Sequence, residues 1–333
     1  MGRAIIVAAR IAAALAIAGG GAWGAFFLWF RAPGGPVTAG ILAGLFAAAS
    51  LAALAGLFLR RPVLPAGWAL LFGGLVVAFL LLPARADRDW EPEVSRTLTA
   101  TLDGDRLAVR DVRVFDWRTE TEFTPRWEDR SFDLATLRSV DLINSYWAGP
   151  VIAHTLLSFG FEDGRFLTVS FEIRREKGEV YSNLAGFFRQ YELVVIGADD
   201  RDIVRLRTNV RGEDTQIYRV RAEPAEIRPL LEEVIRRANS VAARPVWYNS
   251  LFANCTTELF RIARTVAPGL PFDWRIILSG YLPDYVYDLK RLDTRLGFAD
   301  LKARSRVSEQ GRRIGDSPDF GRLVREGLPD PNR

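Results

Sequence analysis

Two residues that could carry out chemistry each occur once in the 333 residues: Cys255 is the only cysteine and His154 the only histidine. A thiol as nucleophile and an imidazole as general base are the minimum for thiol catalysis. One cysteine and one histidine exclude an intrachain disulfide and a larger cysteine–histidine metal cluster. The sequence therefore predicts thiol chemistry without a metal or another cofactor.

Cys255 lies in YNSLFANCTTELFR, at the predicted first turn of a helix. Asn254 is a good N-cap, and the positive end of the helix would lower the pKa of the thiol. The N–H groups of Thr256 and Thr257 are expected to point outward and could bind an oxyanion. Asn254, Thr256 and Tyr248 are thus the candidates for oxyanion binding or substrate positioning, although Tyr248 could merely pack its loop. A buried core cysteine is the alternative, which the polar neighbours argue against.

His154 lies in the segment GPVIAHTLLSFGF, which predicts a strand. A catalytic imidazole needs a third group to fix its tautomer. The next strand of the predicted hairpin places Glu172 opposite His154 or one pair away, so Glu172 is the candidate for this role, with Ser170 and Asn254 next in line. The alternatives are a core histidine and an exposed glutamate paired with a neighbouring arginine.

The N-terminal part of the chain has three uncharged stretches, residues 11–30, 37–59 and 63–82. Each is close to the ~20 apolar residues that cross a bilayer as a helix. They predict three transmembrane helices. A cleaved signal peptide is the alternative for the first stretch, but its apolar run is long and two more stretches follow.

Charge predicts the orientation of these helices. Residues 1–83 contain five arginines and no acidic residue, so the net charge of +4 belongs to this part and the rest is near neutral. The charge is therefore no sign of a nucleic-acid partner. Arginines flank the first helix on its N-terminal side and fill the second loop, which places both in the cytoplasm. We expect a multi-pass protein of the bacterial inner membrane with a periplasmic C-terminal domain.

The rest of the chain predicts one α+β domain. Two segments predict β-hairpins, which turn at residues 103–104 and 163–164. Two further segments, YELVVIGA and TQIYRVRA, each predict a single strand. Helical spacing follows at residues 227–241, after Cys255, and in the aromatic segment from Trp274 to Leu292.

The predicted organisation has four parts. Residues 1–83 form a three-helix membrane anchor and residues 84–96 a polar linker. Residues 97–304 form the periplasmic domain, and residues 305–333 form a polar C-terminal tail that is extended or loosely packed.

Several segments resemble the Lnb N-terminal periplasmic domain family, over about residues 107–290: SYWAGPVIAHTLLSFGFEDGRFLTVSFEIRREKGEVYS, RLRTNVRGED and YNSLFANCTTEL. The family resembles circularly permuted papain-like thiol enzymes, in which the histidine strand precedes the cysteine helix. Its namesake is an intramolecular transacylase, which moves an acyl chain from the sn-2 position of the lipid on a lipoprotein cysteine to that cysteine's α-amine. The resemblance implies a papain-like fold with Cys255 as acyl-carrying nucleophile and His154 as base.

We therefore expect a membrane-anchored cysteine acyltransferase that acts on a lipoprotein or lipid ester, with membrane lipids or lipoproteins as partners. The segment from Trp274 to Leu292 could line an apolar channel that reaches Cys255, or it could pack on the core. One alternative function is a periplasmic cysteine peptidase or amidase acting on cell-wall peptides. Another is a non-catalytic domain that binds an envelope partner.

Overall fold

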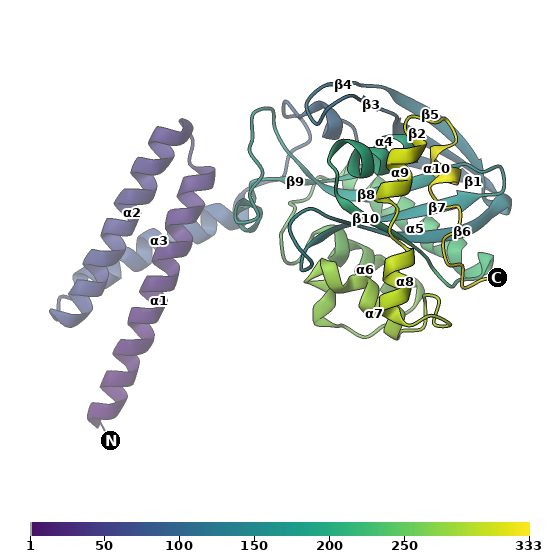
Figure 1. Cartoon of the computed structure of the whole chain (residues 1–333). Coiled ribbons are helices and arrows are strands. Elements are labelled where there is room, and N and C mark those ends of the chain that lie inside the picture. The colour runs from purple at the N-terminus through teal and green to yellow at the C-terminus, as the bar shows by residue number, and fades with distance from the viewer. Residues whose placement is uncertain (1) are drawn as a thin grey trace. The chain divides into compact units, whose positions relative to one another are not determined.

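The computed structural model describes residues 2–333, which form two compact units. The first holds the N-terminal residues up to Ala84 together with Tyr181–Tyr191. The second holds Arg85–Val180 and Glu192–Arg333 (Figure 1). The fold is mixed α+β, as predicted.

The first unit contains three long helices, α1 (Gly2–Arg31), α2 (Gly35–Phe58) and α3 (Val63–Leu81). All three are long and apolar enough to cross a membrane. A Cβ at Gly24 of α1 would lie 2.3 Å from the ring of Phe46 in α2, so glycine allows these helices to approach closely. The predicted apolar helices are therefore present.

A short segment from the β8–β9 connection also belongs to this first unit. It contains the 3₁₀ turn η3 (Ala185–Phe188), and the ring of Phe188 stacks on Phe30 of α1 at 5.7 Å. The guanidinium of Arg189 donates hydrogen bonds to the carbonyls of Phe79 and Leu82 at the end of α3. A cation that binds the last carbonyls of a helix is a favourable C-terminal cap.

The second unit is built on one twisted sheet with the order β1-β2-β9-β8-β7-β6-β10, and β5 pairs with β2. Neighbouring strands are antiparallel except β2 and β9. A separate small ladder joins β3 and β4. The strands are β1 (Thr99–Asp103), β2 (Arg106–Arg113), β3 (Asp116–Trp117), β4 (Phe123–Thr124), β5 (Trp127–Asp133), β6 (Leu137–Tyr146), β7 (Ala153–Phe161), β8 (Phe166–Arg174), β9 (Glu192–Ala198) and β10 (Asp214–Arg219).

Both predicted hairpins are present, as β1–β2 and β7–β8, and the two further predicted strands are β9 and β10. Strands β5 and β6 were not predicted from the sequence. In β6 only the second residue is exposed, and its last eight residues are all buried. A strand buried on both faces lacks the alternation of apolar and polar residues by which strands are recognised.

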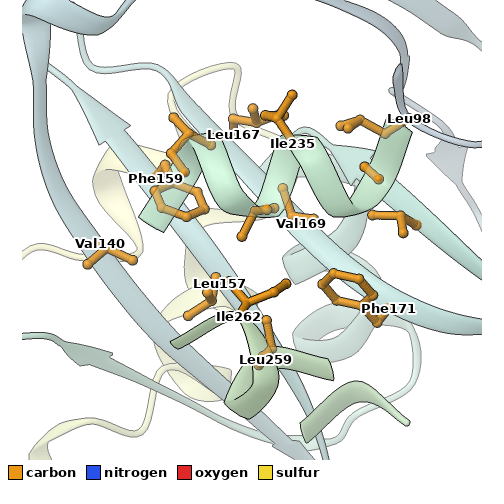
Figure 2. Close-up of a cluster of buried hydrophobic side chains, with 14 of the residues drawn as sticks. Leu98, Val140, Leu157, Phe159, Leu167, Val169, Phe171, Ile235, Leu259 and Ile262 are labelled. Carbon is orange, nitrogen blue, oxygen red and sulfur yellow. The ribbon is translucent and has the colours of Figure 1, made fainter. Parts of the chain in front are cut away.

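Helices cover both faces of the sheet. On one face, Ile235 of α5 (Pro224–Ala243) and Leu259 and Ile262 of α6 (Cys255–Val266) meet the apolar strand residues (Figure 2). The same core continues through the shorter elements η5 (Trp274–Ile276), η6 (Ser279–Tyr281), α7 (Leu282–Asp288) and α8 (Phe298–Arg304). The other face is covered by α4 (Asp200–Arg205), the π-helix η4 (Leu206–Val210), α9 (Ser308–Ile314) and α10 (Phe320–Leu323).

The C-terminal residues 305–333 differ from the predicted loose tail. They form α9 and α10, and Val307, Phe320 and Val324 are fully buried against the second face of the sheet. Three well-spaced apolar side chains are enough to anchor this segment, whereas its low overall apolar content had suggested a loose one. The linker is also packed on the domain, because Val94 in the turn η1 (Pro92–Val94) is buried.

Candidate functional site

Cys255 is the first residue of α6, and Asn254 caps the helix in front of it. The Asn254 side-chain oxygen accepts hydrogen bonds from the backbone N–H of Thr256 (3.1 Å) and of Thr257 (2.9 Å). Its amide nitrogen donates to the carbonyl of Ser250 at 2.8 Å. The Asn254 side chain is therefore committed to holding the start of the helix.

This cap changes the expected oxyanion donors. The N–H groups of Thr256 and Thr257, which were expected to point outward, already donate to Asn254. Within the described residues no acceptor faces the N–H of Cys255 itself, as the geometry of a first helical residue dictates. The Thr256 side chain is buried, and Tyr248 packs at the edge of the core.

The imidazole of His154 is held from the next strand. Its Nε2 lies 2.7 Å from the hydroxyl of Ser170, and that hydroxyl donates to the carboxylate of Glu172 at 2.9 Å. The direct distance from Nε2 to the Glu172 oxygen is 3.6 Å, too long for a hydrogen bond. Because Ser170 donates to Glu172, its oxygen accepts from Nε2–H. Glu172 thus lies where the sequence predicted it, but it reaches His154 through Ser170.

The thiol meets the imidazole where β7 and β8 separate. The ladder between these strands ends at the pair Leu156 and Ser170. Beyond that pair the Cys255 thiol lies beside the imidazole of His154 and the backbone N–H of Thr155, close enough for each to affect its pKa. With Nε2 engaged by Ser170, Nδ1 is the ring nitrogen left to accept the thiol proton.

The pKa values of the two groups shift toward an ion pair. Burial raises the pKa of the Cys255 thiol, but the adjacent imidazole of His154 and its positive charge outweigh this effect, so the pKa lies below its ordinary value. Burial and Arg207 lower the pKa of His154, yet its contacts with Cys255 and Glu172 leave it above its ordinary value. Each partner therefore favours the charged form of the other.

The Glu172 carboxylate stays ionised. Burial raises the pKa of Glu172, but the nearby His154, with the charges of Arg207 and Arg113, holds it well below its ordinary value. A permanent negative charge in this place favours a protonated imidazole.

Ser170 was next in line for the orienting role, and the structure places its hydroxyl between His154 and Glu172. Arg207 was not predicted as a site residue. It lies in RLRTNVRGED, a segment singled out only for its family resemblance. Its position beside Glu172 depends on long-range packing that no local pattern encodes.

The aromatic segment from Trp274 to Leu292 is partly buried in the core and partly exposed. Ile276, Leu282 and Tyr285 are buried in the core, whereas Trp274 is 56% exposed. Phe272 is also exposed and lines a cavity of about 480 Å³ beside α6. Aromatic and aliphatic side chains form much of its wall, together with two arginines: Leu251, Phe252, Phe260, Arg261, Arg264, Phe272, Ile276 and Ile277. Cys255 is not part of that lining, so a channel to the thiol stays a prediction.

Within residues 2–333 no group of three His, Cys, Asp or Glu side chains is placed to hold a metal ion.

The family model of the Lnb N-terminal periplasmic domain matches residues 123–280, just under half of the chain. No curated protein and no solved structure matches the chain. The three apolar helices and the periplasmic-domain match fit a membrane protein with a periplasmic domain. The matched residues include both Cys255 and His154, so the region that brings them together is similar to the Lnb N-terminal periplasmic domain family.

Proposed function

We propose that this protein is a membrane-anchored thiol acyltransferase that forms an acyl-thioester on Cys255. The observation that carries the proposal is the placement of the Cys255 thiol beside His154, whose ring is hydrogen-bonded through Ser170 to Glu172. A nucleophile, a base and a group that orients the base are the parts of a catalytic triad. A core cysteine would need none of them.

The residues suggest a two-step reaction. His154 takes the thiol proton at Nδ1, and the thiolate attacks the carbonyl carbon of an ester. The ester C–O bond breaks, the alcohol leaves with the proton from His154, and a thioester remains on Cys255. An amine, or water, then attacks the thioester and loses a proton to His154, which returns it to the thiol. The acyl group ends on the acceptor.

The developing oxyanion would be stabilised at the start of α6. The N–H of Cys255 is the donor that the Asn254 cap leaves for this purpose. The positive end of the helix adds to this stabilisation. Asn254 and Thr256 would then act by fixing the direction of that N–H.

We also propose a permuted papain-like arrangement and an inner-membrane location. The cysteine at a helix start, packed against an antiparallel sheet whose earlier strand carries the histidine, supports the first. Arg3 and Arg10 in the first turns of α1, and Arg60 and Arg61 between α2 and α3, support a cytoplasmic N-terminus and a periplasmic catalytic domain.

A lipid or lipoprotein ester is the substrate class that best suits these features. The three apolar helices keep the enzyme in the membrane where such esters lie. Exposed Phe252 and Phe272 and the cavity beside α6 offer apolar surface along that helix. A large exposed apolar surface usually marks a binding site.

The test is to trap the acyl-enzyme. The full chain in detergent micelles is incubated with a diacylated lipopeptide, and the mass of the Cys255 peptide is measured at acidic pH. We expect a mass gain of one acyl chain that hydroxylamine removes and that Cys255→Ser, in which any ester resists neutral hydroxylamine, does not show. Cleavage of a muropeptide without acyl transfer would favour a peptidase or amidase. No reaction with either substrate would favour a binding domain.

A further inference from the structure

Arg207 is a buried arginine whose position calls for an explanation. It lies in the π-helix η4 and is only 4% exposed. Burying a guanidinium is costly unless carboxylates compensate its charge. Single π-helical turns are rare and occur frequently at functional sites.

The guanidinium of Arg207 bridges two carboxylates across the sheet. One terminal nitrogen lies 3.5 Å from Glu172 at the end of β8, and the other lies 3.5 Å from Glu213 just before β10. Strands β7 and β6 lie between these two in the sheet, and there His154 pairs with Ser145. Ser145 in turn donates a hydrogen bond to Glu213. Arg207 therefore spans the strands that carry the catalytic base.

We propose that Arg207 is a positioning residue that holds the Glu172 carboxylate where it accepts the Ser170 hydroxyl. The proposal rests on the proposed function, because it assigns Arg207 to the thiol chemistry of the same site. A serine hydroxyl can either donate or accept. While Glu172 takes its proton, Ser170 must accept Nε2–H from His154, and Nδ1 stays free for the thiol.

Without a fixed carboxylate the Ser170 hydroxyl could rotate and donate to Nε2 instead. The imidazole proton would then lie on Nδ1, and the thiol would lose its base. Arg207 would thus set the tautomer of His154 at a distance, without touching the ring or the substrate.

A purely electrostatic role for Arg207 predicts the opposite effect. The charged groups around Glu172 and Arg207 are His154, Arg113, Arg211 and Glu213. The positive charge of Arg207 by itself lowers the pKa of His154. If that charge were its only contribution, removing it would favour the imidazolium and make the thiolate more abundant at acidic pH.

The experiment measures the rate at which iodoacetamide alkylates Cys255 at pH 6 in the full chain in detergent micelles. We expect Arg207→Met to slow alkylation about tenfold, which corresponds to one pKa unit. Glu172→Gln should slow alkylation similarly. The double variant should react no more slowly than either single variant, because both changes break the same set of contacts from Glu172 through Ser170 to His154. Arg207→Lys keeps the charge but cannot contact both carboxylates at once, so its alkylation rate should lie between those of the wild type and Arg207→Met. An unchanged or faster rate in Arg207→Met would overturn the proposal, and so would additive losses in the double variant.

Two controls separate this result from misfolding. Arg211 approaches Glu213 at 3.7 Å from the same segment but is not in contact with Glu172, so Arg211→Met should alkylate at the wild-type rate. The variant Arg207→Met with Glu213→Gln removes one buried charge of each sign and should fold while still reacting slowly. A wild-type rate in that variant would overturn the proposal. A wild-type protein that reacts no faster than free cysteine would instead overturn the proposed function itself.

Discussion

Cys255, the first residue of α6, lies beside His154, the second residue of β7, at the point where β7 and β8 part. The contact joins a helix from one layer of the domain to the sheet beneath it. Since each group shifts the pKa of the other, the thiol and imidazole titrate as a pair. Their reactivity must therefore be read from the pair and not from either residue alone.

Alkylation of Cys255 should be fast at mildly acidic pH. Because the pKa of its thiol is lowered, a larger share is thiolate at pH 6 than in free cysteine. Iodoacetamide should modify it far faster than free cysteine at that pH, and His154→Ala should slow the reaction. Equal rates for the protein and free cysteine, or a thiol that does not react in the folded protein, would mark Cys255 as a core residue.

Glu172→Gln should lower turnover of the lipopeptide by one or more orders of magnitude while the fold is kept, because a neutral amide no longer demands the Ser170 proton. Ser170→Ala should cost a similar factor, since it breaks the only hydrogen bond to Nε2 in the described residues. Steady-state kinetics and circular dichroism test both. Wild-type turnover in either variant would remove that residue from the relay.

The elements that carry the site were predictable from local pattern. The turn at residues 163–164 fixed the β7–β8 register closely enough to place Glu172 beside His154, and Asn254 signalled the start of α6. The bridging role of Ser170 could not be predicted, because the partner of a hydroxyl is not known until the strand register is known. Arg207 and the packed C-terminal residues depend on contacts between distant parts of the chain, which neither propensity nor periodicity encodes.

Asn254→Ala should destabilise the protein and weaken the site together. The lost cap of α6 is expected to cost about 1–2 kcal/mol in free energy of unfolding, because the N–H groups of Thr256 and Thr257 lose their acceptor. Urea denaturation of the full chain in micelles measures this loss. Asn254→Asp, which keeps the acceptor oxygen, should retain most of the stability but place a negative charge near the thiolate, so Cys255 should alkylate more slowly.

Stability should fall with acid in a way that depends on Glu172. The folded pKa of this carboxylate is well below its unfolded value of 4.5, so its contribution is present above 4.5 and is lost as the pH falls through the folded pKa. Thermal unfolding of the wild type between pH 6 and pH 3 should therefore decline more steeply than that of Glu172→Gln. Parallel curves for the two proteins would show that Glu172 is not held ionised in the fold.

The C-terminal segment should be essential to the domain, which Arg325 can test. Its guanidinium pairs with Asp141 at 2.6 Å and with Asp200, and donates to the hydroxyl of Ser158 at 2.7 Å, all in the buried layer behind the sheet. Removing one partner of a buried ion pair leaves uncompensated charge and costs about 3–5 kcal/mol. Arg325→Met should therefore lower the free energy of unfolding by that amount, measured by urea denaturation.

The matched control is Arg322→Met, at an exposed position three residues earlier. It should change the free energy of unfolding by less than about 0.5 kcal/mol, because surface ion pairs contribute little. Equal, small losses in both variants would mean that residues 305–333 are the loosely packed tail that their composition suggests.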